Sequence, residues 1–227
     1  SDMADWFYRP TWKESVPPTQ LFGEIDFGSC LLFLDCCDFG SQLVKTLEKA
    51  GQKVSTVKIG REFREITDHD YMINPQHKED YEALIKALRT HQRLPKTIIH
   101  LWRITPNNQE AFTLEGIDES QMFGYYSLLF LSQALGKQNV TDEIQIAVIS
   151  NNMQTVTDEE VLYPEKATLL GPIKVIGQEY PNLRCRSIDL KSSVFQTGKG
   201  HVHFQREKLI TQLLAELTIK SDDQVIA

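Results

Sequence analysis

Cys30-Leu31-Leu32-Phe33-Leu34 is a continuous apolar run, and it begins a series of alternating apolar strands and amphipathic helices. A strand that is apolar on both faces is typical of a parallel sheet covered by helices on each side. The segment that follows, residues 42–50, has apolar residues at helical spacing and ends before Gly51. We therefore predict a first strand–helix unit over residues 30–51.

The same alternation continues to the end of the chain. Further strands are predicted over residues 53–59, 97–102, 144–149 and 183–190, further helices over 80–91, 121–135, 165–180 and 204–217, and a loop over 71–75. Five consecutive strand–helix units require right-handed crossovers. The predicted fold class is α/β: a truncated Rossmann-like, doubly wound, mostly parallel sheet of about five to six strands flanked by helices.

The overall composition excludes several classes of protein. The 227 residues are 41% hydrophobic and 24% charged, which is typical of a globular domain. The net charge of -7 disfavours nucleic acid and anionic membrane surfaces as partners, because both attract positive patches. No apolar stretch approaches the ~20 residues of a membrane-spanning helix, and no signal-peptide pattern begins the chain. We expect no nucleic-acid or membrane partner.

Four cysteines are present, Cys30, Cys36, Cys37 and Cys185, and three of them lie in or beside apolar runs. The adjacent pair lacks the two-residue gap by which paired thiolates hold one zinc ion. We therefore expect small buried hydrophobic residues rather than metal ligands or disulfides. Such sparse cysteine usage is typical of a reducing compartment, and the predicted location is the cytoplasm.

The first strand–helix turn, residues 35–41, decides whether the fold can bind a dinucleotide. A pyrophosphate needs several glycines there, so that backbone amides at the helix N-terminus can approach it. Gly40 is the one glycine in the turn, Phe39 is expected to block close approach, and Asp35 and Asp38 would repel phosphate. Asp38 is interpreted as a helix N-cap. No cofactor-binding residue is predicted.

The catalytic groups of a short-chain reductase are incomplete. Such an enzyme uses a tyrosine, a lysine four residues later and a serine. Here Tyr163 precedes Lys166 by three residues, and Pro164 places the tyrosine before the helix. Ser150 follows the fourth strand, where such a serine would lie, but it completes no active site. No catalytic residue is predicted.

Other polar and aromatic candidates have simpler interpretations. His201 and His203 are assigned to a loop without a metal role, and His100 to the core. Residues 158–160 read as a solvated acidic turn, and the pair Tyr125-Tyr126 as core or interface. No metal-binding residue is predicted.

Several motifs carry a family resemblance across roughly residues 6–227. They are His100-Leu101-Trp102, residues 123–129 and 146–151, the run from Pro164 to Ile176, and residues 178–190. Together they resemble the structural subdomain of ketoreductases in bacterial modular polyketide synthases. Within residues 1–28, Ser1-Asp2-Met3 is interpreted as a tag remnant, and the resemblance implies that an aromatic and proline-rich lead-in strand follows it. Residues 29–227 are the Rossmann-like structural subdomain.

The resemblance implies a function. In that family the ketoreductase consists of two short-chain-dehydrogenase-like halves, of which the first binds no cofactor and the second carries the NADPH site. The chain is then a non-catalytic scaffold that stabilises the downstream catalytic half, which reduces β-ketoacyl groups on a phosphopantetheine arm of a carrier protein. Other synthase domains are expected as neighbours, and residues 6–14 are expected to contact the catalytic half.

Two other functions remain open at this stage. The first is a free-standing nucleotide-dependent oxidoreductase with an atypical loop. The second is an interaction module, such as a pseudo-ketoreductase beside a methyltransferase or an enoylreductase. Binding of NADPH would favour the first, and partners other than the catalytic half would favour the second.

Overall fold

One eight-stranded sheet runs through the part of the chain that the computed structural model describes, residues 11–15, 27–106, 114–156, 161–191, 195, 201–219 and 224–227. Its strand order is β3-β4-β2-β1-β5-β6-β7-β8, and every neighbouring pair is parallel except β3 with β4. The strands are β1 (Ser29–Phe33), β2 (Lys53–Ile59), β3 (Arg64–Glu65), β4 (Asp70–Ile73), β5 (Thr97–Arg103), β6 (Ile144–Asn151), β7 (Leu183–Leu190) and β8 (Val225–Ile226).

The strand order reverses at β1. From β1 the chain moves outward to β2 and β4, and then returns to add β5, β6, β7 and β8 on the other side. In the register, Leu31 lies opposite Ser55 of β2 and opposite Ile98 of β5. This arrangement confirms the predicted doubly wound α/β fold. It also places the carboxyl ends of β1, β5 and β6 next to one another, where ligands bind in open sheets of this type.

The predicted number of strands is wrong, because three short strands at the edges of the sheet were not recognised. β4 lies in the segment predicted to be a loop, and it buries Tyr71 and Ile73 alternately. β3 and β8 have two residues each. Segments this short carry too few apolar residues to show a period, so their pairing depends on the neighbouring strand.

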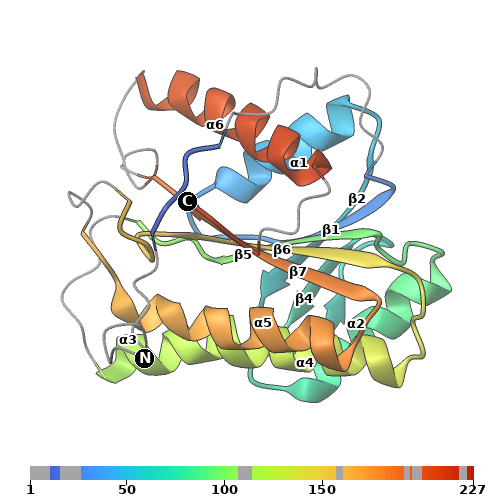
Figure 1. Cartoon of the computed structure of the whole chain (residues 1–227). Coiled ribbons are helices and arrows are strands. Elements are labelled where there is room, and N and C mark those ends of the chain that lie inside the picture. Colours follow the sequence, from blue (N-terminus) through green and yellow to red (C-terminus); the bar gives the residue numbers. More distant parts are fainter. Residues whose placement is uncertain are drawn as a thin grey trace.

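Helices cover both faces of the sheet (Figure 1). On one face lie α1 (Phe39–Lys49) and α6 (His201–Thr218). On the other face lie α2 (Lys78–Thr90), α4 (Ser127–Lys137) and α5 (Leu170–Glu179), with α3 (Leu114–Ser120) beside them. Two of the predicted helices begin with a segment that is not α-helical. The wider π-helix η3 (Gln121–Tyr126) precedes α4, and the tighter 3-10 helix η4 (Pro164–Leu169) precedes α5.

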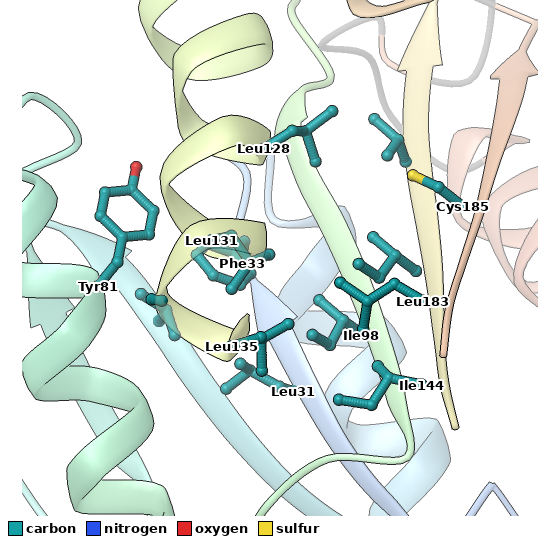
Figure 2. Packing of buried hydrophobic residues seen from close by; sticks show 14 of the residues in the cluster. Leu31, Phe33, Tyr81, Ile98, Leu128, Leu131, Leu135, Ile144, Leu183 and Cys185 are labelled. Atoms are coloured by element: carbon teal, nitrogen blue, oxygen red, sulfur yellow. The ribbon is translucent and has the colours of Figure 1, made fainter. Parts of the chain in front are cut away.

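Alternate residues of the central strand enter two separate cores. Leu31 and Phe33 pack in the core under α2, α4 and α5, whereas Leu32 packs in the core under α1 and α6. Figure 2 shows the first of these cores, in which Leu131 and Leu135 of α4 lie over residues of the sheet. Because residues 30–33 of β1 are buried on both faces of the sheet, they are all apolar.

Candidate functional site

The turn between β1 and α1 is occupied by its own carboxylate. Asp35 accepts hydrogen bonds from the backbone N–H groups of Cys37 at 2.7 Å, Phe39 at 3.3 Å and Gly40 at 2.5 Å. Amides at the start of a helix attract an anion, and here the anion is a side chain of the same turn. Burial raises the pKa of Asp35, and the three amide hydrogen bonds act in the opposite direction.

The interpretation of Asp38 as a helix N-cap is right for its position but wrong for the expected hydrogen bond, because its side chain does not cap the helix. It does occupy the N-cap position, with a left-handed φ of 61°, but it makes no capping hydrogen bond there. The carboxylate of Asp35 satisfies the first amides of α1 instead. The left-handed backbone at Asp38 is compatible with an aspartate, which tolerates this region better than most residues.

Phe39 does not block the turn, contrary to the prediction. Its ring is buried in the core under α1 and α6, where it packs edge-on against Phe195 with 5.4 Å between ring centroids. Gly40 is needed because the first turn of α1 approaches the sheet closely. A Cβ there would lie 2.8 Å from Asp35 Oδ1 and 2.9 Å from both Leu34 Cδ2 and Leu101 Cδ1.

The turn therefore does not fit a dinucleotide pyrophosphate. Three of its amides are already hydrogen-bonded to Asp35, and the carboxylate would stand beside the phosphates with the same sign of charge. Displacing the carboxylate would leave a half-buried charge without its donors.

A buried network lies at the neighbouring carboxyl ends of β5 and β6. The fully buried Lys166 donates through Nζ to Thr105 Oγ1 at 2.8 Å, to Asn151 O at 2.7 Å and to Asn151 Oδ1 at 2.7 Å. These bonds use all three donors of the ammonium group. Burial, with a smaller contribution from the positive charge of Arg103, lowers the pKa of Lys166 to about 7. Lys166 thus joins the two strand ends.

Tyr163 lies beside this lysine. The centroid of its ring is 5.1 Å from Lys166 Nζ, and its backbone N–H donates to Asn152 O at 2.8 Å. Pro164 begins η4 directly after it, as predicted. The structure therefore brings the predicted tyrosine and lysine together, but the lysine ammonium bonds to Thr105 and Asn151.

Ser150 lies on β6, at the predicted strand end, and is fully buried. Its hydroxyl donates to Asp189 Oδ1 at 2.8 Å, while Asp189 Oδ2 accepts from the backbone N–H groups of Met153 and Gln154 at 2.9 Å each. Burial raises the pKa of Asp189, and these hydrogen bonds oppose that rise. The hydroxyl of Ser150 thus bonds β6 to Asp189 of β7, and the other oxygen of Asp189 holds the loop after β6.

Arg103 is a buried cation that the sequence analysis missed. It ends β5 with 3% of its surface exposed, and its Nε has no hydrogen-bond partner among the described residues. Burial lowers the pKa of Arg103 to about 10, although the negative charges of Glu165 and Glu119 act to raise it. The sequence does indicate this residue, because Arg103 is a charged residue directly after six residues of a strand in a doubly wound sheet.

The remaining predicted residues have mixed outcomes. His100 is a core residue as predicted: it shares a 2.7 Å hydrogen bond with Ser127 Oγ, and burial lowers its pKa to about 3. Tyr125 and Tyr126 are 39% and 38% exposed, so they are not core residues, and their interpretation as interface residues stays a prediction. His201 and His203 belong to the first turn of α6 rather than to a loop, and the alternation of histidines with Val202 and Phe204 shows no helical period.

The cysteines divide into two classes. Cys30 and Cys185 are buried, as predicted. Cys36 is exposed and Cys37 is half-buried, so the expectation of buried hydrophobic residues is wrong for this pair, which lies in the turn beyond the end of β1.

Several predicted features lie outside the described residues or concern absences. The acidic turn 158–160, most of the lead-in segment and the side chains of His201 and His203 are not described. Among the side chains that are described, no group of three or more His, Cys, Asp or Glu is arranged to hold a metal ion. None of the described helices has the length and apolar character that crossing a bilayer requires.

Comparison with solved structures identifies assembly-line proteins among the relatives. A keto acid-selecting NRPS module with adenylation, ketoreductase and pseudo Asub domains matches with a TM-score of 0.78 and 25% identity over 93% of this chain. An N-terminal ketoreductase from the macrolactin assembly line matches with a TM-score of 0.71 and 19% identity over 90% of this chain. The chain spans 17% and 39% of the lengths of these two proteins.

Free-standing short-chain dehydrogenases share the fold more distantly. One from Burkholderia cenocepacia J2315, solved with NADP, has a TM-score of 0.57 and 14% identity over 89% of this chain and 90% of its own. No curated protein has a sequence significantly similar to the chain.

A family model supplies the assignment at the level of sequence. The model for beta-ketoacyl synthase-like N-terminal domains matches residues 29–205, well over half of the chain. With the two assembly-line structures, this match confirms the resemblance to a ketoreductase structural subdomain. The chain belongs to the beta-ketoacyl synthase-like, N-terminal family.

Proposed function

We propose that the chain is a non-catalytic scaffold that stabilises a separate catalytic half of an assembly-line ketoreductase. The catalytic half reduces β-ketoacyl groups with NADPH while the substrate is carried on a phosphopantetheine arm. The observation that carries this proposal is the carboxylate of Asp35, which is bonded to three amides where a cofactor phosphate would lie. Neighbouring synthase domains and a cytoplasmic location belong to the same proposal.

The network at the ends of β5 and β6 supports the absence of reductase chemistry. A short-chain reductase needs a lysine that acts on its tyrosine and a serine that holds the substrate carbonyl. Here the ammonium of Lys166 is committed to Thr105 and Asn151, and the hydroxyl of Ser150 to Asp189. Both groups stabilise strand ends, so we expect no reduction by the isolated chain. This disfavours a free-standing oxidoreductase.

A surface patch of exposed apolar residues supports a partner. We define the tyrosine patch as Tyr125 and Tyr126 of η3 and Val175 of α5, which are 39%, 38% and 48% exposed. A Cβ at Gly171 would lie 3.8 Å from the ring of Tyr125, and Val175 is one helical turn further along α5. The three side chains therefore lie on adjoining helices. Clusters of this kind mark protein–protein contacts.

The patch fits a partner within a longer polypeptide. The two assembly-line relatives contain this fold as 17% and 39% of their lengths, so in such proteins much more chain is present to cover it. We propose that the tyrosine patch contacts the catalytic half, together with residues 6–14. Of that second segment, residues 11–14 are described, and the indole N–H of Trp12 donates to Thr155 O at 2.5 Å.

Reconstitution from two chains tests the proposal. The catalytic half is assayed for NADPH oxidation with a model β-ketothioester, alone and with this chain added. We expect a higher rate and a higher melting temperature for the mixture, and loss of both gains when Tyr125 and Tyr126 are replaced by glutamate. Ile66→Glu is the matched control, because Ile66 is a 57% exposed apolar residue beyond β3, the edge strand opposite β8.

Two results would contradict the proposal. One is a catalytic half that is equally active and equally stable with and without the chain. The other is a binding partner of a different kind that depends on the tyrosine patch, which would favour an independent interaction module.

A further inference from the structure

Two thiols lie side by side in the β1–α1 turn. Cys36 Sγ and Cys37 Sγ are 3.7 Å apart, with Cys36 exposed and Cys37 half-buried. The other two cysteines provide an internal contrast, because Cys30 and Cys185 are 1% and 5% exposed. The adjacent pair is thus accessible to small molecules in solution, and the other two are not.

The environment of the pair favours one thiolate at neutral pH. The hydrogen bond from the Cys37 thiol lowers the pKa of Cys36 to about 7, while burial and the charge of Asp35 act against this. The same hydrogen bond raises the pKa of Cys37. The positive charge of Lys166 also favours the Cys36 thiolate, and that of Arg206 favours ionisation of Cys37. The two sulfurs therefore titrate as a unit that keeps one proton.

We propose that Cys36 and Cys37 form a thiol–disulfide exchange site for low-molecular-weight disulfides, in which Cys36 attacks and Cys37 resolves. This inference does not depend on the proposed scaffold function. It rests on the short distance between the two sulfurs and on their accessibility, which Cys30 and Cys185 lack.

The chemistry balances in two exchange steps. The Cys36 thiolate attacks one sulfur of the small disulfide, the S–S bond of that disulfide breaks, and one small thiolate leaves and takes up a proton. Cys37 then loses its proton to solvent and attacks Cys36 Sγ, which expels the second small thiolate. The small disulfide is reduced to two thiols, and the protein is oxidised by the loss of two hydrogens.

Closure of the pair requires a local change in the turn. The two sulfurs must move from 3.7 Å to the bonding distance of about 2.05 Å. Adjacent residues form a small ring, and the amide of Cys37 is held by Asp35 at 2.7 Å. The product is therefore strained, and strained disulfides are readily reduced again. We expect reversible oxidation.

Oxidised glutathione is the probe. The intact chain is incubated with it at pH 7, quenched with acid, alkylated and analysed by mass spectrometry. We expect Cys36 and Cys37 to lose both thiols without retaining glutathione, and Cys30 and Cys185 to remain alkylatable. Cys37→Ser is expected to retain one glutathione on Cys36, because the resolving thiol is gone. Dithiothreitol should restore both proteins.

Cys36→Ser separates the roles of the two thiols. At pH 7 a pKa of about 7 gives roughly fifteenfold more thiolate than an unperturbed thiol, and the lower nucleophilicity offsets part of this gain. Burial and the charge of Asp35 raise the pKa of the remaining Cys37 thiol, so we expect the variant to react at least about threefold more slowly. A stable glutathione adduct on the wild-type chain, or no difference between the pair and the buried cysteines, would overturn the proposal. Circular dichroism of the serine variants verifies that the fold is retained.

Discussion

Replacement of Lys166 by methionine should change how the stability of the chain depends on pH. Lys166 is fully buried, and its pKa falls from 10.5 to about 7 on folding, chiefly because burial removes water from the ammonium group. Between these two values the unfolded chain binds more protons than the folded chain. Stability must therefore increase as the pH rises from about 7 towards 10.5.

The size of the effect follows from the shift. One pKa unit corresponds to about 1.4 kcal/mol, and between pH 7 and pH 9 the lysine contributes an increase of about 2 kcal/mol in the free energy of unfolding. Methionine has a similar volume and no proton to bind. It removes this pH-dependent contribution, together with the smaller effect that the Lys166 charge has on the titration of Cys36.

Urea unfolding at pH 7, 8 and 9 measures the difference between the two proteins. We expect the free energy of unfolding of the wild type, relative to Lys166→Met, to increase by about 2 kcal/mol over this range. Parallel pH curves for the two proteins would show that the ammonium of Lys166 is not held in a dry site. The interpretation of Lys166 as a structural bond between β5 and β6 would then be wrong.

Three further changes test the turn and the core. Gly40→Ala places a Cβ within 2.9 Å of Leu101, and we expect a loss of about 1–3 kcal/mol in the free energy of unfolding by urea titration. A change below about 0.5 kcal/mol would show that the turn relaxes freely. Asp35→Ala leaves three amides of the turn without their acceptor, and we expect a loss of about 2 kcal/mol by the same measurement. Equal stability would mean that water replaces the carboxylate. His100 has a pKa lowered to about 3 by burial, so between pH 3 and pH 6.5 the unfolded chain binds more protons, and stability falls as the pH decreases through this range. His100→Gln, which retains a polar partner for Ser127, should flatten the acid limb of a thermal-unfolding series, and an unchanged acid midpoint would contradict this.

The fold was predictable where burial on both faces of a strand imposes a long apolar run. Residues 30–34 and 146–149 are such runs, and β1 and β6 contain nearly all of these residues. β4 was missed although Tyr71 and Ile73 alternate, because four residues are too few to separate a strand from a loop. Strands at a sheet edge depend on their neighbour, and that neighbour is not visible in the local sequence.

The site was predictable in composition but not in geometry. The sequence shows two aspartates in the turn, yet the left-handed backbone at Asp38 and the reach of Asp35 to three amides are properties of the folded chain. The partners of Lys166, Thr105 and Asn151, are 61 and 15 residues away in the sequence. Spacing to Tyr163 alone therefore could not show what the lysine does.

Titration of the isolated chain with NADPH, followed by nicotinamide fluorescence, tests the central claim most directly. If the carboxylate of Asp35 fills the site of a cofactor phosphate, no change in fluorescence should appear up to millimolar NADPH. The same result is expected with a second preparation, the control variant Ile66→Glu. Saturable binding, accompanied by reduction of a β-ketothioester by the chain alone, would contradict a non-catalytic scaffold.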